Sequence, residues 1–292
     1  MLEAKNISIY SNNINIEDIS FKVDEGDFFV IFGPDDSGKT ELLNAIMGII
    51  PCHAGKFYYR EKSMNALSIK DRKSIRFVPD DILLLQNMRA KDYLKHIAAT
   101  YRVKEVDFME SLIKYFDIDV SEKLTDMTFE SNKLVAIIGA LMTFPEFLIL
   151  DEPFNFLTAS ACKKLLNMLK KFNDKGMTIL ITAENFEDLD NRCNRLMYIN
   201  EGKLIQKCRI RKDTDSYKSL TIRSKNFKQI EQYLGQPFKI DDSTRTYICG
   251  YDFNKISSII KKCNIADSDI NISTASIKDA LDFITSTHQK DN

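Results

Sequence analysis

The stretch from residue 33 to residue 40 has the residue types and the spacing of a loop that holds a nucleotide phosphate. It reads Gly-Pro-Asp-Asp-Ser-Gly-Lys-Thr, which satisfies the pattern Gly-x-x-x-x-Gly-Lys-Thr. In such a loop, backbone N–H groups and the start of the following helix cradle phosphate oxygens, the lysine reaches the β and γ phosphates, and the threonine hydroxyl binds magnesium. The plainer interpretation is a glycine-rich turn without a ligand. We expect nucleotide-binding residues at Gly33, Pro34, Asp35, Asp36, Ser37, Gly38, Lys39, Thr40 and Glu41.

A pair of carboxylates ends a second apolar run, Phe-Leu-Ile-Leu-Asp-Glu at residues 147–152. The carboxyl ends of strands are where open α/β sheets bind ligands. There Asp151 would hold magnesium, and Glu152 would orient and deprotonate an attacking water while Lys39 offsets phosphate charge. Acid pairs are also common in loops and at helix starts, so this pair gains its meaning from the phosphate loop. ATP and Mg²⁺ are the expected cofactors.

Apolar runs that end at these motifs predict the strands of a parallel α/β sheet. Buried strands are expected at 28–32, 147–152 and 177–182, and a strand at 195–199 turns into another at 204–208. The first of them feeds straight into the phosphate loop. The alternation of short β-rich runs with helical ones is typical of parallel α/β proteins.

Helical spacing of apolar residues appears after the phosphate loop and again in the middle of the chain. A helix is expected at 40–50, ended before Pro51. Three further helices at 92–101, 108–116 and 131–142 predict a helical insertion into the sheet domain, at about 82–145.

A second series of predicted strands and helices begins after residue 212. Strand, helix, one or two strands, helix and strand follow in that order, with a last helix from Ser276. This is the order of a split βαβ, ferredoxin-like unit. We expect an α/β nucleotide-binding domain at 1–212 and a small α+β domain at 213–292.

Composition limits the class of protein. The 292 residues carry a formal net charge of -1, so bulk electrostatics give no attraction to nucleic acid, and no nucleic-acid partner is expected. Six cysteines lie far apart, with no Cys-x-x-Cys and no histidine at metal-ligand spacing, which indicates a reducing compartment rather than disulfides or a metal-thiolate site. No run approaches the roughly 18 to 20 apolar residues of a membrane-spanning helix.

The phosphate loop, the helical insertion and the Leu-Ile-Leu-Asp-Glu-Pro segment together resemble the nucleotide-binding subunit of an ABC (ATP-binding cassette) transporter over residues 2–205. The resemblance implies a P-loop NTPase fold. Residues 270–285 are similar to the tail of a regulatory or accessory domain in the drug, antibiotic and peptide exporter branch. The resemblance makes Tyr10 the aromatic residue that stacks on adenine, although Tyr10 also reads as an ordinary edge-strand tyrosine.

This chain departs from several motifs of that family. Asp80 stands in place of the glutamine loop's residue and is a hard oxygen donor for magnesium. Met-Thr-Phe-Glu-Ser at 127–131 replaces the Leu-Ser-Gly-Gly-Gln signature, so Phe129 and Glu130 stand where glycines let backbone N–H groups approach the γ-phosphate of the opposite subunit. Glu130 equally suits the start of a helix.

Further departures lie near the phosphates. Thr158 replaces an aspartate, and Glu184 replaces the histidine that contacts the γ-phosphate; an ionised glutamate accepts hydrogen bonds but cannot donate one. Glu41 stands where a small hydroxyl residue is usual near the α-phosphate. Asp36 is compatible with the loop because aspartate tolerates left-handed backbone.

The resemblance implies an ATPase subunit, cytoplasmic and peripheral on the inner face of the cell membrane. It would couple ATP binding, and hydrolysis that is slow or partner-dependent, to export through a separate integral membrane subunit. A second cassette, identical or different, would complete the dimer; because the signature acts across the dimer, its changes favour a heterodimer. Two alternatives stay open: an inert, ATP-gated regulatory subunit, and a soluble ABC protein without a transport role.

Overall fold

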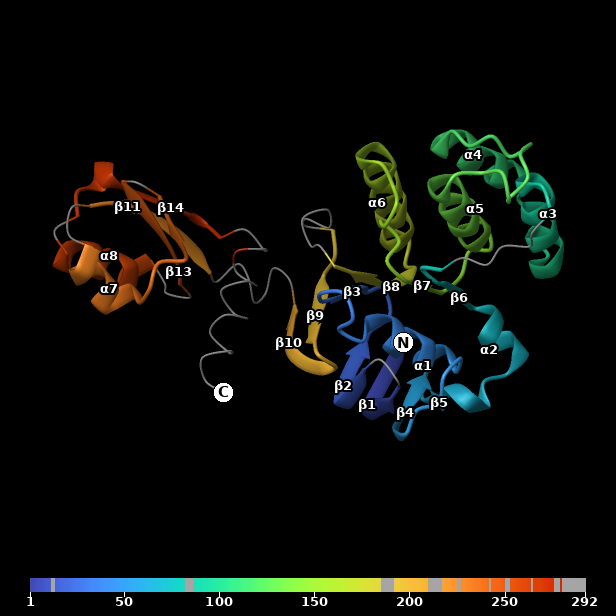
Figure 1. The fold of residues 1–292 in the computed structure, drawn as a ribbon, viewed down its shortest axis with the longest axis horizontal. Helices are drawn as coiled ribbons and strands as arrows, with labels where there is room; N and C mark the ends of the chain where they lie inside the picture. The colour runs from blue at the N-terminus through green and yellow to red at the C-terminus, as the bar shows by residue number, and fades with distance from the viewer. Residues whose placement is uncertain are drawn as a thin grey trace. The chain divides into compact units, whose positions relative to one another are not determined.

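The computed structural model describes residues 1–11, 14–81, 87–184, 192–209, 217–224, 227–241, 243–249, 253–263, 265–275 and 279. The chain divides into two compact units, Met1–Leu204 and Ile205–Asn292 (Figure 1). The domain boundary predicted after residue 212 lies outside the described residues, as do the start of the predicted helical insertion at residue 82 and the last helix from Ser276.

A six-stranded sheet in the order β10-β9-β3-β8-β7-β6 forms the centre of the first unit. β3 pairs in parallel with β8 and β9, and β7 pairs in parallel with β6 and β8, so these strands form the expected parallel sheet, to which β6 is an unpredicted addition. The strands are β3 (Phe28–Phe32), β6 (Ile75–Val78), β7 (Phe147–Leu150), β8 (Thr178–Ala183), β9 (Arg195–Asn200) and β10 (Lys203–Arg209).

A second, antiparallel sheet in the order β2-β1-β4-β5 covers the helix that follows the phosphate loop. Its alternating isoleucines, such as Ile7, Ile9 and Ile16, share one core with Leu42 and Ile46 of α1. α1 therefore packs against apolar side chains from both sheets. The elements of this region are β1 (Leu2–Tyr10), β2 (Asn15–Val23), α1 (Lys39–Met47), β4 (Ala54–Tyr59), β5 (Lys62–Ser63), the 3-10 helix η1 (Met64–Ala66) and α2 (Ile69–Lys73).

Helix α1 ends earlier than its sequence predicts. The expected helix ran to residue 50, but Gly48 takes a left-handed conformation with φ of 73° and caps the helix after Met47. Glycine adopts this conformation at no steric cost, so the helix stops at the glycine and not at Pro51.

Three helices between β6 and β7 form the predicted insertion, and they gather together in the green part of Figure 1. They are α3 (Ala90–Tyr101), α4 (Val106–Phe116) and α5 (Phe129–Leu141). Thr128 caps α5, because its hydroxyl accepts the backbone N–H of Ser131, so the helix starts at Phe129, earlier than predicted. α6 (Ala159–Asp174) joins β7 to β8. No helix among the described residues combines the length and the apolar character needed to cross a bilayer.

The second unit has a four-stranded antiparallel sheet in the order β12-β13-β11-β14. Leu220, Ile222 and Tyr247 of the sheet pack with Ile230 of α7 and Ile256 of α8. The elements are β11 (Lys218–Arg223), α7 (Phe227–Leu234), β12 (Lys239–Ile240), β13 (Thr244–Cys249), α8 (Phe253–Lys262), η3 (Asp267–Asp269) and β14 (Ile270–Thr274).

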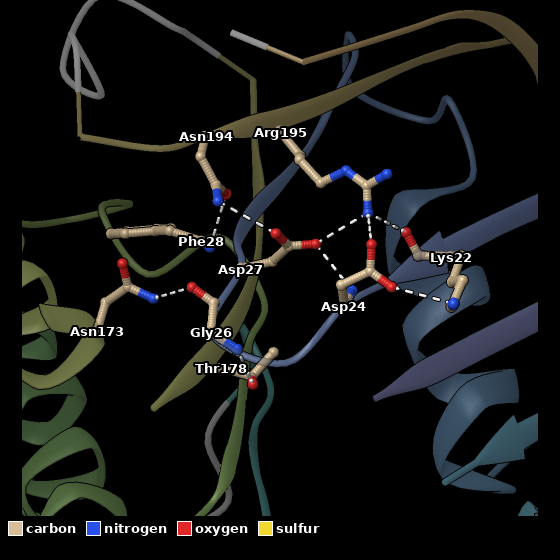
Figure 2. A network of polar contacts seen from close by, with 9 residues as sticks. All are labelled: Lys22, Asp24, Gly26, Asp27, Phe28, Asn173, Thr178, Asn194 and Arg195. Carbon is tan, nitrogen blue, oxygen red and sulfur yellow. Dashed lines mark hydrogen bonds and ion pairs between the residues drawn. The ribbon is translucent and has the colours of Figure 1, made fainter. Parts of the chain in front are cut away.

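A polar network joins the amino ends of β3, β8 and β9, which are the strand ends opposite the phosphate loop (Figure 2). Asp27 is buried and its carboxylate accepts hydrogen bonds from the Asp24 backbone N–H and the Asn194 amide, and pairs with Arg195 at 3.0 Å. The Asn194 side chain also accepts the Phe28 N–H at 2.9 Å. Asp27 thus fixes where β3 begins.

Replacing Asp27 by alanine is expected to lower the free energy of unfolding by about 2 to 3 kcal/mol, because buried donors and the Arg195 cation lose their carboxylate partner. The loss stays below that of a fully buried pair since Arg195 also contacts Asp24. Chemical denaturation measures it. The control is Glu25→Ala, which removes an exposed carboxylate and should cost less than about 0.5 kcal/mol. Equal losses in the two variants would contradict a structural role for the network.

Candidate functional site

The predicted phosphate loop lies between β3 and α1 with the backbone that its glycines require. A Cβ on Gly33 would lie 2.2 Å from the carbonyl oxygen of Ile199, so only glycine fits beside β9. Gly38 and Asp36 have φ of 100° and 56°, which bears out the expectation that Asp36 tolerates the left-handed turn. Pro34, Asp35 and Asp36 are exposed at the loop tip.

Lys39, the first residue of α1, points back into the loop. Its ammonium donates to the carbonyl oxygens of Gly33 and Pro34, both at 2.8 Å, and pairs with Glu152 at 3.2 Å. The side chain is 5% exposed. The only positive side chain of the loop is therefore held between the loop backbone and the Glu152 carboxylate, two residues beyond β7.

The helix start beyond Lys39 is open to an anion. Gly38 caps α1 without a side-chain hydrogen bond, and Thr40 is exposed in the first turn. The Ser37 hydroxyl is buried and makes no hydrogen bond within the described part of the chain. Such a helix start, with its free N–H groups and dipole, favours phosphate. Glu41 is half-buried in the same turn.

Asp151 lies directly after β7 and is 2% exposed. One carboxylate oxygen accepts the Thr182 hydroxyl at 2.7 Å, and the other makes no hydrogen bond to the described residues. Burial raises the pKa of Asp151, while hydrogen bonding from Thr182 and Thr40 lowers it. A buried oxygen of this kind beside the Thr40 hydroxyl fits a hard cation such as Mg²⁺.

Glu152 takes an uncommon backbone conformation for a residue other than glycine, with φ of 39°. Its N–H donates to the Thr182 hydroxyl at 2.7 Å, and its carbonyl oxygen accepts the Lys133 ammonium at 2.9 Å. Burial raises the pKa of the Glu152 carboxyl, and the neighbouring Lys39 ammonium lowers it. The carboxyl and the phosphate loop thus meet at Lys39.

Asp80 follows β6 by two residues and comes to the same end of the sheet. Its carboxylate pairs with Lys133 of α5 at 2.5 Å, and its charge raises the pKa of both Asp151 and Glu152. The predicted metal ligand is therefore near the acid pair, and its nearest described cation is a lysine of the helical insertion.

Residues 127–131, which stand in place of the signature, cap a helix and make hydrogen bonds within the chain. Thr128 caps α5, Phe129 is exposed, and the Glu130 carboxylate accepts the backbone N–H of Thr158 at 2.6 Å. Thr158 caps α6 in turn. Glu130 thus links two helix starts, which agrees with the helix-start interpretation of that residue.

Two other predicted residues, Tyr10 and Glu184, lie at the ends of strands. Tyr10 ends β1 with an exposed ring 5.1 Å from the ring of His53, whose Nδ1 accepts the Tyr10 N–H. Glu184 is exposed just beyond β8. No group of three or more metal-ligating side chains from His, Cys, Asp and Glu is found among the described residues.

Two residues of the site were missed from the sequence. Thr182 bridges Asp151 and Glu152, and its place at the end of a predicted buried strand beside the acid pair was an available signal. Lys133 lies in a helix with no charge pattern that points to Glu152. Its contact depends on how the insertion packs against the sheet, which sequence spacing does not reveal.

Replacing Asp151 by asparagine is expected to raise the stability of the nucleotide-free chain, since a raised folded pKa means that ionisation opposes folding. The same change should remove the stabilisation that Mg-ATP gives. Thermal unfolding with and without Mg-ATP measures both effects. Asp126→Asn, a change at an exposed carboxylate, is the control. Lower stability without nucleotide would contradict the reasoning.

Comparison with known proteins agrees with this geometry. Residues 16–155 match the family model described as ABC transporter. The chain is 26% identical over 211 residues to the linearmycin resistance ATP-binding protein LnrL of Bacillus subtilis, covering 70% of this chain and 68% of that one. It is 29% identical over 215 residues to the molybdate/tungstate import ATP-binding protein WtpC of Thermococcus kodakarensis, covering 70% and 64%. It is 24% identical to the lipopolysaccharide export ATP-binding protein LptB of Escherichia coli, covering 82% and 99%.

Solved structures share the fold. An ATP-binding subunit of an ABC transporter superposes with a TM-score of 0.65 at 22% identity, over 72% of this chain and 90% of that chain. The dimeric cassette MJ0796 bound to ADP and Pi gives 0.63, over 72% and 99%. Residues 16–155 are thus similar in sequence to the ABC transporter family, and the chain shares its fold with ATP-binding cassettes of known structure.

Proposed function

We propose that this chain is the ATP-binding subunit of an ABC transporter and that it couples ATP binding and hydrolysis to substrate movement through a separate integral membrane subunit. The observation that carries the proposal is the meeting of Lys39, Thr40, Asp151 and Glu152 at one end of the sheet. Phosphate-binding, metal-binding and proton-accepting groups then lie within one small site.

Each group has a distinct part in binding. The loop backbone from Gly33 to Gly38 and the start of α1 would hold the phosphates, and the Tyr10 ring, exposed at the end of β1, would stack on the adenine. Thr40 and Asp151, with Asp80 nearby, would hold Mg²⁺. When bound, Mg²⁺ supplies positive charge that offsets the phosphate oxygens.

Hydrolysis would proceed by in-line attack of water on the γ-phosphate, in which the bond from the γ-phosphorus to the β–γ bridging oxygen breaks and ADP leaves. Lys39 would move its ammonium from Glu152 to phosphate oxygens, which leaves the Glu152 carboxylate free to accept a hydrogen bond from the water and then its proton. Burial of Glu152 favours proton acceptance, because it raises the pKa of the carboxyl.

The relatives support transport and two-cassette assembly. Their names describe resistance, export and import proteins, and the MJ0796 structures are dimeric. We propose export, a membrane partner that docks on the helical insertion, and a place on the cytoplasmic face of the membrane. For Ile205–Asn292 we propose a ferredoxin-like accessory domain, supported by the sheet order β12-β13-β11-β14 with α7 and α8 packed on it.

The test is ATP binding measured beside phosphate release on the purified chain, alone and with its membrane partner. We expect saturable binding that weakens when EDTA removes Mg²⁺, and phosphate release that increases in the complex. ADP and GTP titrations establish nucleotide preference. Absence of saturable ATP binding would refute the proposal at its first step, and binding without phosphate release in the complex would limit it to an ATP-gated subunit.

A further inference from the structure

A buried lysine of the helical insertion reaches the residue that we assign as catalytic base. Lys133 lies in the second turn of α5 and is 3% exposed. Its ammonium pairs with Asp80 at 2.5 Å and donates to the Glu152 carbonyl oxygen at 2.9 Å, and it lies 5.5 Å from the centre of the Phe156 ring. A buried ammonium is stable only with such partners, so this position is built for a cation.

The backbone that Lys133 contacts is strained. Glu152 has φ of 39°, a conformation that costs a residue with a side chain of the order of 1 kcal/mol or more. Two hydrogen bonds hold it: the N–H is bound by Thr182 of β8, and the carbonyl is bound by Lys133. The direction of the Glu152 side chain follows from this turn, because the Cα substituents rotate with the backbone.

The two lysines of the site contact different parts of Glu152. Lys39 contacts the carboxylate from the phosphate loop, and Lys133 contacts the backbone from the insertion. Asp80 neutralises Lys133, so this cation can hold a carbonyl oxygen without drawing the Glu152 carboxylate toward itself. Loss of Lys133 would leave the carboxyl present but free to take other positions.

We propose that Lys133 is a positioning residue for hydrolysis: its ammonium, with Asp80 as counter-ion, fixes the strained turn at Glu152 and so the place of the carboxylate relative to the attacked phosphate. The proposal rests on the proposed function, in which Glu152 is the base. Lys133 contacts no residue of the phosphate loop in the described structure, and the proposed Mg²⁺ ligands Thr40 and Asp151 stay in place without it, so its loss acts on the chemical step more than on nucleotide binding.

The first test is Lys133→Met, which keeps the length of the side chain and removes the charge and the donors. In the complex with the membrane partner, kcat is expected to fall about 100-fold, the cost of a misplaced catalytic group, with the KM and the Kd for ATP within about threefold of wild type. Lys133→Arg keeps a cation and donors and should recover part of the loss. Lys163→Met, at an exposed lysine of α6, is the matched control for charge. An unchanged kcat, or a rise in Kd that accounts for the fall, would overturn the proposal.

The second test combines Lys133→Met with Glu152→Gln. If Lys133 works through Glu152, the double variant is as slow as Glu152→Gln alone, since a base that has been removed cannot be misplaced. Multiplied losses would show that Lys133 acts by another route and would overturn the proposal.

A third readout does not depend on hydrolysis. Amide hydrogen exchange of the segment 147–158 in the nucleotide-free full chain should accelerate roughly tenfold in Lys133→Met and stay unchanged in Lys163→Met, because the held turn opens more often. Unfolding curves distinguish this local opening from global destabilisation. If wild type and Glu152→Gln release phosphate equally, the proposed role of Glu152 as base is wrong. Hydrogen exchange would still test whether Lys133 holds the turn. Unchanged exchange would show that Lys133 does not hold the turn.

Discussion

Glu152→Gln is expected to lower phosphate release in the transport complex by about 1,000-fold, the contribution of a well-placed general base, while ATP still binds. The amide keeps the size of the side chain but has no carboxylate to accept the proton of the attacking water. It also ends the ion pair with Lys39, whose ammonium then keeps only the carbonyl oxygens of Gly33 and Pro34 as partners among the described residues. We therefore expect ATP to bind at least as tightly as in wild type.

Single-turnover phosphate release and equilibrium ATP binding measure these two effects separately. Glu146→Gln is a suitable control, because it changes an exposed glutamate shortly before β7 and outside the site. Phosphate release from Glu152→Gln at the wild-type rate would show that another group accepts the proton. Weaker ATP binding would show that Glu152 contributes to the nucleotide site and does not compete with it.

Lys39→Met is expected to weaken ATP binding by about 100-fold, since hydrogen bonds between charged groups are worth about 1.5 to 3 kcal/mol. It should also destabilise the nucleotide-free chain, because Glu152 loses the cation that opposes the effect of burial. Glu152 then keeps a pKa raised above its unfolded value. Its contribution to stability is present while the carboxyl is protonated and is lost as pH rises through that raised pKa, so the loss should be larger at pH 8 than at pH 5.

The two effects of Lys39→Met can be separated with a second change. Adding Glu152→Gln removes the carboxylate that lost its cation, so stability at pH 8 should return while ATP binding stays weak. Thermal unfolding at the two pH values and a binding titration give the required data. If the double variant is as unstable as Lys39→Met alone, the lysine stabilises the fold through the loop carbonyls, and the role assigned to the ion pair is wrong.

The parts of the fold that carry chemistry were predicted well, because their residue types demand a particular structure. The strand at 28–32 and the loop after it are found as expected, since buried parallel strands are continuous apolar runs. The strand expected at 147–152 ends at Leu150, so the acid pair follows the strand and is not part of it. The antiparallel sheet of β1, β2, β4 and β5 was not predicted. Its strands alternate apolar and polar residues, but register shifts interrupt the pairing of β1 with both neighbours.

The contacts that complete the site could not be predicted in the same way. Lys133 reaches the Glu152 carbonyl oxygen across 19 residues of sequence, Thr182 reaches the Glu152 N–H across 30, and Asp80, a predicted residue, pairs with Lys133 across 53. Helical spacing identified α5 but not which of its polar residues turns inward, because a buried lysine has no periodic signal. Propensity and pattern describe elements one at a time, whereas these contacts depend on how the elements pack.

The position of α1 between two sheets has a thermodynamic consequence for the whole first unit. A ligand held at the start of that helix stabilises an element whose side chains belong to the core of both sheets, so binding is linked to cooperative unfolding and not to a local loop. At ATP concentrations near 100 times the Kd, this linkage adds about 2.7 kcal/mol. A cell that is depleted of nucleotide would then hold a less stable subunit, one that proteases degrade faster, and its abundance would follow the energy state of the cell.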